Sequence, residues 1–284
     1  ILDTHFENQI KLLSNNKTIH KQNLKIYCNE YRMNKFNLSE IEFFHNNYLL
    51  AFDLYENRRK IIQTEFINDD DVQLLQQMKE LNYDQFLNSD NRSVIVLSEQ
   101  GYGDQIMISR YLKELEHLGF KVTFIANNEL IKFFRCFSEL DNINIKGKIS
   151  RKDLLTNSSI VWSMSLPFLF YKKNIRSFDV LDKPLLKKIN LNSPPFRSRN
   201  NKKKIGICWR GNPKNRRDNE RSIDPNILKN ILQNKDYDFF VFHKKINQID
   251  TKIIQKHPNV FSLSDNLNDF YESSCYLNEM NMVI

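Results

Sequence analysis

The stretch of sequence that decides the fold is residues 94–105, which read VIVLSEQGYGDQ. It begins with the apolar run 94–97, of the kind found in a strand buried in a parallel sheet. A turn with two glycines follows at 101–103. Apolar residues then recur at the three-and-four spacing of an amphipathic helix, at Ile108, Tyr111, Leu112 and Leu115. The stretch therefore predicts a strand, a tight turn and a helix.

The same alternation continues along the chain in two series. Further strands are expected at 122–125, 143–145 and 160–162, with a helix at 129–137. A second series contains expected strands at 205–209, 239–242 and 282–284, and expected helices at 225–232 and 268–277. Strands that alternate with helices predict an α/β protein with doubly wound parallel sheets.

The domain organisation follows from changes in pattern. Residues 1–62 are expected to form a short α-helical segment, because apolar residues near 48–55 take helical spacing. Residues 63–191 and 204–284 are expected to be two α/β domains, joined by a polar linker at 192–203 that contains Pro194 and Pro195. The chain begins with Ile1 and stops in an expected strand, so we expect it to be a fragment that lacks both natural ends.

Composition excludes several classes of protein. Hydrophobic residues make up 40% and charged residues 27%, as in ordinary soluble globular proteins. The longest apolar stretch, 160–171, is well short of the roughly 20 residues of a membrane helix. The four cysteines are far apart and form no CxxC pair, which excludes a disulfide scaffold and a zinc ribbon. We expect a cytoplasmic protein without a membrane span.

The net charge of +8 raises the question of a nucleic-acid partner. The basic residues are scattered, and the aromatic residues are not interleaved with them in a stacking platform. The chain is also rich in Asn, Lys, Ile and Phe, as AT-rich coding would produce. We therefore expect no nucleic-acid partner.

The turn at 98–105 is the richest candidate site. Two glycines between a strand and a helix allow a ligand to approach the backbone and the helix N-terminus. The dinucleotide fingerprint GxGxxG fails, since Ile106 stands at its third position and Ala126 follows the second strand where an acid is needed. Asp104 has two interpretations that stay open here: it is a general base at the end of a parallel strand, or it caps the helix that follows.

A second acidic pattern lies at 69–71, which reads DDD. Asp69 and Asp71 have the spacing of a carboxylate pair that holds a metal. They also precede a helical stripe that begins at Val72, where acids cap free N–H groups and suit the helix dipole. The capping interpretation is favoured, so no metal is expected.

The strand at 205–209 leads into a loop that reads WRGNP at 209–213. Arg216, Arg217 and Arg221 follow it, and a helix is expected soon after. A Gly turn, guanidinium groups and a helix start are the parts of a diphosphate site, although a solvated basic loop fits equally well. Lys244 stands at the end of the next strand and could add a second cation.

These stretches together resemble one family. Residues 99–112, EQGYGDQIMISRYL, resemble the EQGxGDxxxxxRYL signature of bacterial glycosyltransferases fused to tetratricopeptide repeats. Tyr55-Glu56-x-Arg58 resembles the YEWR motif of that family, and 163–167 resembles its SLP segment. The loop at 209–213 and the triplet at 221–223 resemble its WxGNP and RSI motifs. The resemblance covers about residues 55–284.

The family is similar to the heptosyltransferases, which implies the GT-B fold: two Rossmann-like domains that face each other across a cleft. It implies that Asp104 is the base that activates the acceptor hydroxyl. The acceptor-side turn would then consist of Glu99, Gln100, Gly101, Gly103 and Gln105. The residues implied to bind the nucleotide-sugar donor are Trp209, Gly211, Asn212, Arg221, Ser222 and Lys244. His243 stands where the family usually has Gln, which puts a sugar contact at that position in doubt.

The resemblance thus implies an inverting, metal-independent glycosyltransferase that needs no cofactor. Its partners would be a nucleotide-sugar donor and a protein, peptide or glycan acceptor. The family has a diphosphate-binding Asp-Thr-x-x-x-His-Leu-x-Gly segment after the strand that matches 282–284, so we expect this chain by itself to bind donor weakly and turn over little. The alternative is a non-catalytic repeat-protein scaffold with a degenerate transferase body.

Overall fold

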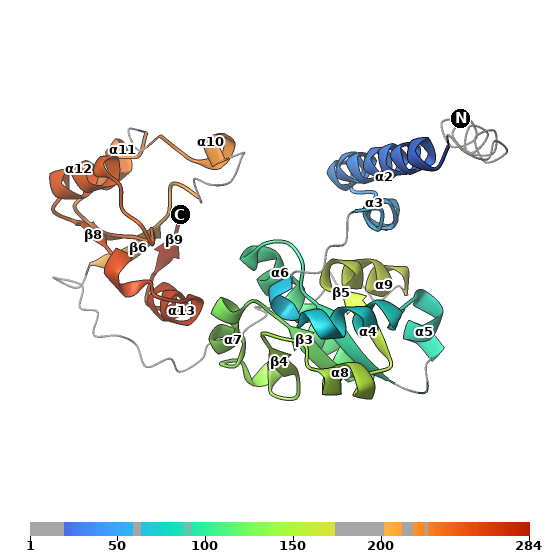
Figure 1. The fold of residues 1–284 in the computed structure, drawn as a ribbon. Helices are drawn as coiled ribbons and strands as arrows, with labels where there is room; N and C mark the ends of the chain where they lie inside the picture. The colour runs from blue at the N-terminus through green and yellow to red at the C-terminus, as the bar shows by residue number, and fades with distance from the viewer. Residues whose placement is uncertain are drawn as a thin grey trace. The chain divides into compact units, whose positions relative to one another are not determined.

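The computed structural model describes residues 20–58, 64–88, 90, 92–173, 202–211, 218–224 and 227–284 (Figure 1). The contacts divide the chain into two compact units. The first unit consists of Ile1–Ala126 with Asn142–Leu185, and the second of Asn127–Asp141 with Leu186–Ile284. The expected linker at 192–203 lies outside the described residues except for its last two positions.

The first unit is built on a five-stranded sheet. Its strands are β1 (Lys79–Glu80), β2 (Ser93–Leu97), β3 (Lys121–Ile125), β4 (Asn144–Lys146) and β5 (Ser159–Trp162). They lie in the order β1-β5-β2-β3-β4, and every neighbouring pair is parallel. This confirms the predicted α/β class with parallel strands. The two-residue β1 was not predicted, because Lys79 and Glu80 are both charged and exposed and give no apolar run.

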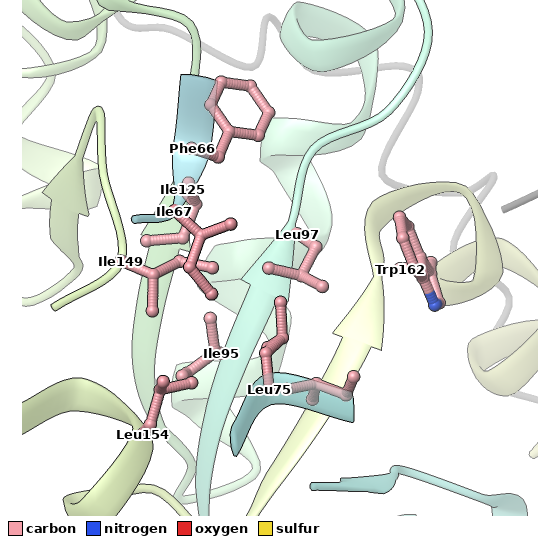
Figure 2. Close-up of a cluster of buried hydrophobic side chains, with 10 residues drawn as sticks. Phe66, Ile67, Leu75, Ile95, Leu97, Ile125, Ile149, Leu154 and Trp162 are labelled. Atoms are coloured by element: carbon pink, nitrogen blue, oxygen red, sulfur yellow. The ribbon is translucent and has the colours of Figure 1, made fainter. Parts of the chain in front are cut away.

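The central strand β2 is buried along its whole length, as the apolar run predicts. Successive side chains of a strand point to opposite faces, so each face of the sheet needs its own cover. Figure 2 shows one such cluster, in which Ile95 and Leu97 of β2 pack with Ile125 of β3 and with residues from outside the sheet. Burying a side chain of this size contributes about 1.5–3 kcal/mol.

Helices cover the sheet of the first unit. They are α4 (Val72–Gln77), α5 (Tyr83–Asn88), α6 (Tyr102–His117), α8 (Arg151–Thr156) and α9 (Leu166–Lys172). The apolar stripe that predicted α6 is buried: Ile108, Tyr111, Leu112 and Leu115 are each at most 5% exposed. Within the described residues, no helix combines the length and the apolar composition needed to cross a membrane.

The acids at 69–71 form a 3₁₀ turn directly before α4. The predicted side-chain caps are not made at this helix start. The turn itself uses the backbone groups that a cap would bind, since the Asp71 N–H donates to the Asn68 carbonyl at 3.0 Å. The capping interpretation was therefore wrong in its mechanism, although the position before the helix still suits the dipole.

The segment before the sheet is helical, as predicted, over the part that the structure describes. Helices α2 (His20–Phe44) and α3 (Tyr48–Tyr55) form a hairpin that turns at Asn46, whose φ is 62°. The rings of Phe43 and Phe52 meet edge to face at 4.9 Å and join the two helices. Helix α3 packs on α9, where Phe52 lies 6.0 Å from the ring of Tyr171.

The second unit contains a four-stranded parallel sheet. Its strands are β6 (Lys203–Ile207), β7 (Tyr237–Val241), β8 (Val260–Ser262) and β9 (Met282–Val283), in the order β8-β7-β6-β9. Its helices are α10 (Asp218–Arg221), α11 (Lys229–Leu232), α12 (Gln248–Lys256) and α13 (Phe270–Asn278), and α7 (Asn128–Phe134) groups with α13. The expected strand at 205–209 ends at Ile207. Strand β8 and helix α12 were not predicted.

Candidate functional site

The first unit has a topological switch point between β2 and β5. The chain leaves β2 toward β3 and β4 on one side, and returns to β5 on the other side. Ligands of open parallel sheets bind at the carboxyl ends of the strands at such a point. The residues that follow β2 are Ser98 and Glu99, and the residue that follows β5 is Ser163.

Arg58, three residues after the end of α3, reaches this switch point and joins three separate segments there. Its Nε donates to Glu99 Oε1 at 2.5 Å, its Nη1 to Glu56 Oε1 at 2.8 Å, and its Nη2 to Ser165 Oγ at 2.9 Å. The side chains of Arg58 and Glu99 are only 3% and 8% exposed. The structure thus brings together the segments that resemble the YEWR, EQGxGD and SLP motifs.

The charges of this cluster are fixed by its surroundings. Burial by itself would lower the pKa of Arg58, but the carboxylates of Glu99 and Glu56 raise that pKa overall. Burial raises the pKa of Tyr55, whose ring lies 4.9 Å from the guanidinium. Arg58 is therefore a permanent cation beside a neutral phenol, and its ion pair with Glu99 fixes the carboxyl end of β2.

The turn after β2 is shaped by a left-handed residue. Gln100 has a φ of 67°, a conformation that a side chain rarely adopts. Helix α6 begins two residues later, and Asp104 in its first turn accepts a hydrogen bond from the Gly101 N–H at 2.9 Å. The side chain of Gln105 is fully buried. The capping interpretation of Asp104 is thus confirmed, and its role as a base stays a prediction.

There is room beside Asp104 for a ligand. A Cβ added at Gly103 would meet no atom within 4 Å, so the turn is open at that point. Asp104 is partly exposed, and no second hydrogen bond to its carboxylate forms within the part of the chain that the structure describes. The free oxygen is therefore accessible to an approaching hydroxyl.

Two buried serines flank the switch point and were not singled out from the sequence. Ser98 and Ser163 are 2% and 0% exposed, and among the described residues neither Oγ has a hydrogen-bond partner. They follow Leu97 and Trp162, which are register partners, so they are neighbours at the sheet edge. Buried hydroxyls are normally satisfied, so water or a ligand group is expected to bind them. Their position directly after two strands was the only signal.

The second unit has its own switch point, between β6 and β9. Here the structure brings together two of the predicted donor segments. The Ile223 N–H donates to the Trp209 carbonyl at 2.7 Å, and the Gly211 N–H donates to Ser222 Oγ at 3.3 Å. Asn212 lies outside the described residues, and Arg221 is placed only as the last residue of α10.

Trp209 itself lies inside the second unit. Its side chain is 2% exposed, and its indole Nε1 donates to Asp250 Oδ1 at 3.1 Å. Asp250 Oδ2 also accepts from Arg210 Nε at 3.0 Å and from the Asn247 N–H at 3.1 Å. Burial would raise the pKa of Asp250, but Arg210 and the Asn247 N–H lower it overall. Asp250 was missed, although Asn247-x-x-Asp250 has the spacing of a capping box.

His243 belongs to the same buried network. Its Nε2 accepts from the Trp209 N–H at 3.3 Å, and its Nδ1 lies 3.5 Å from Asp250 Oδ2. Burial lowers the pKa of His243; Asp250 opposes this shift without cancelling it. The neutral ring is thus a structural group that accepts from a backbone N–H. Lys244 is exposed, and its Nζ donates to the Asn268 carbonyl at 3.2 Å.

The described residues contain no group of three or more His, Cys, Asp or Glu side chains that could hold a metal ion. The chemistry of both switch points is instead that of carboxylates, hydroxyls, backbone N–H groups and guanidinium ions.

Replacing Arg58 by Met should lower the free energy of unfolding of the first unit by about 3–5 kcal/mol, because Glu99 would stay buried without its cation. Urea denaturation followed by tryptophan fluorescence measures this change. Replacing Glu99 by Gln in the same variant should restore part of the loss. An additive loss in the double variant would contradict the ion-pair account.

Acid should destabilise the second unit through His243. Its folded-state pKa lies below the ordinary value of about 6.5, so the unfolded chain binds more protons in acid. The contribution of His243 to the free energy of unfolding is fully present above about pH 6.5. It is lost as the pH falls through the lower folded-state pKa, by at most about 1.4 kcal/mol per pH unit for one histidine. In His243→Gln this slope should decrease, leaving the part due to His257, whose pKa burial also lowers. Urea midpoints between about pH 8 and pH 5 test this, and an unchanged slope would contradict it.

In comparison searches, no protein-family model, curated protein or solved structure matches the chain.

Proposed function

We propose that the chain is the body of a GT-B glycosyltransferase that moves a sugar from a nucleotide-sugar donor to a hydroxyl acceptor, with inversion and without a metal. The observation that supports this most is the convergence at the β2–β5 switch point. Arg58 binds Glu99, 41 positions away, and Ser165, 107 positions away. Three segments that resemble motifs of one family therefore share one site, at the place where α/β sheets hold their ligands.

In the proposed reaction the acceptor hydroxyl attacks the anomeric carbon of the donor sugar. The bond from that carbon to the diphosphate oxygen breaks, and the nucleoside diphosphate leaves with the electron pair. The hydroxyl proton passes to the carboxylate of Asp104. The open space beside Gly103 and the partial exposure of Asp104 support this assignment.

The donor is assigned to the β6–β9 switch point of the second unit. The hydrogen bonds from Ile223 to Trp209 and from Gly211 to Ser222 hold the segments 209–211 and 222–223 together beside this strand end. Arg221 and Lys244 are the cations proposed to meet the charge of the leaving diphosphate. Trp209 is proposed to position the site and not to touch the donor, because its side chain is buried against Asp250 and its carbonyl accepts from the Ile223 N–H.

A thermal-shift screen tests donor binding. UDP, GDP, ADP and CMP are each added to the chain at millimolar concentration, because donor binding is expected to be weak. One of them should raise its Tm, since a ligand that binds only the folded state stabilises it by mass action. Replacing Lys244 by Gln should reduce the shift, whereas Lys173→Gln, in the first unit, should not. If none of the nucleotides changes the Tm of the folded chain, the transferase proposal fails.

Asp104→Asn tests the base. With the donor that the screen identifies, turnover should fall by about 10²–10⁴-fold while the nucleotide Kd stays the same, since general bases contribute that much. The amide still accepts the hydrogen bond from Gly101, so loss of the helix cap cannot explain a loss of turnover. Unchanged turnover would overturn the assignment.

The second candidate function is a scaffold that binds a partner and has no catalysis. It is favoured by the exposed apolar side chains of the helical hairpin: Phe44 is 85% exposed, and Ile41, Met33 and Leu49 are each at least 50% exposed. Patches of this kind mark interaction surfaces. Absence of nucleotide binding would favour this candidate.

A further inference from the structure

A groove lies on the first unit where α3 packs on α9, and it consists of two adjoining hollows. One, of about 690 Å³, is formed by α3, the turn before it and α9. The other, of about 580 Å³, is formed by α3, α9 and the segment from β1 into α5. Both hollows are lined by Asp53, Phe168 and Lys172, so they adjoin at these three side chains.

The two hollows differ in chemistry. The first is lined mainly by apolar and aromatic groups, among them Leu49 and Leu50, which are 50% and 47% exposed, and Tyr171. Apolar side chains in a concave surface favour an apolar side chain of a partner.

The second hollow is acidic. Its lining includes four carboxylates, from Asp53, Glu56, Glu80 and Asp84. Among the described residues, Lys172 is the only basic one that lines it, and the Lys172 Nζ is held over the rings of Tyr83 and Phe168 at 4.7 and 5.5 Å. Within the described part of the chain, Asp53 and Asp84 make no ion pair. The hollow is acidic although the whole chain has a net charge of +8, and an acidic hollow is complementary to a cationic group.

The acidic hollow shares two side chains with the candidate site. Glu56 and Ser165 line the hollow, and the same two side chains hold Arg58, whose Nε binds Glu99 at the end of β2. The turn that carries Asp104 begins directly after Glu99. The hollow and the turn are therefore connected through the buried Arg58–Glu99 pair.

We propose that this groove binds a polypeptide segment that carries a Lys or Arg side chain next to an apolar one, and that this segment belongs to the acceptor of the transferase. The basic side chain lies beside the carboxylates of Asp53 and Asp84, since Glu56 is already held by Arg58 and Ser165, and the apolar side chain lies against Leu49 and Leu50. The identification of the segment as acceptor rests on the proposed function; the binding itself does not.

The test is fluorescence anisotropy with a short fluorescein-labelled peptide built from Lys, Leu and Ser. The peptide should bind saturably, and Asp53→Asn/Asp84→Asn should weaken its Kd by about threefold to tenfold, as expected for the loss of two exposed charges. The matched control is Asp69→Asn/Asp70→Asn, which removes two exposed carboxylates of the same unit outside the groove and should leave the Kd unchanged.

The apolar half is tested in the same assay. Leu49→Ala should weaken binding, whereas Leu155→Ala, a 69% exposed leucine on α8, should not. A peptide with Ser in place of Leu should bind more weakly, and one with Glu in place of Lys should not bind. All six leucine and aspartate positions are exposed, so the variants are expected to fold, which circular dichroism checks.

Several outcomes would overturn the proposal: no saturable binding, equal losses in the matched controls, or equal binding of the peptide with Ser in place of Leu. Displacement of the peptide by spermine at equal charge would identify a general cation site in place of a polypeptide site. The nucleotide screen separates this proposal from the transferase function. Peptide binding without any nucleotide shift would support the docking groove and contradict its role in binding an acceptor. A nucleotide shift without peptide binding would support the transferase function and contradict the groove.

Discussion

The structure of the first unit depends on one buried ion pair, between Arg58 and Glu99. A guanidinium and a carboxylate that are both nearly inaccessible to water lose much hydration, so each needs the other and further hydrogen bonds. Glu56 and Ser165 supply those bonds, and in doing so they tie the end of the helical hairpin to the carboxyl ends of β2 and β5. The position of the Gly101–Asp104 turn follows from this, because the turn starts at the residue after Glu99.

The second unit also contains a buried ion pair, and here the more deeply buried partner is a carboxylate. Asp250 is the buried ion, and Trp209, Arg210 and the backbone of Asn247 surround it. In both units, a buried charge lies near the end of the strand at the topological switch point, where the chain changes the side of the sheet on which it adds strands. Such a charge is expensive to leave unpaired, so it fixes one arrangement of the loops around it. The loops that a ligand would contact are therefore held by groups that the ligand does not touch.

Much of the fold could be predicted from local pattern. The central strands are continuous apolar runs, and the stripe of α6 has helical period, so β2, β3 and α6 were predicted nearly to their ends. Strand β1 consists of Lys79 and Glu80 and has no apolar run, and the three-residue β8 was also missed, whereas β4 and β9 are equally short but were predicted from apolar residues. The buried charges were the harder part. Arg58 and Asp250 have ordinary polar surroundings in the sequence, and only pairing with residues at least 40 positions away makes their burial favourable. The turn residues 99–105 were found because glycines and strand ends leave a local signal, whereas Ser98, Ser163 and Asp250 leave almost none.

The long sequence separation of the Arg58 contacts has a consequence for synthesis on the ribosome. The helical hairpin is complete once residue 58 has left the exit tunnel, but its anchor at Ser165 is translated 107 residues later. Domains emerge and fold from the N-terminus onward at roughly 5–20 residues per second, so the hairpin waits for several seconds with Arg58 solvated and its apolar face uncovered. The hairpin is thus accessible to chaperones before the residues that anchor it are translated, and translation speed between the two positions would set how long it is exposed.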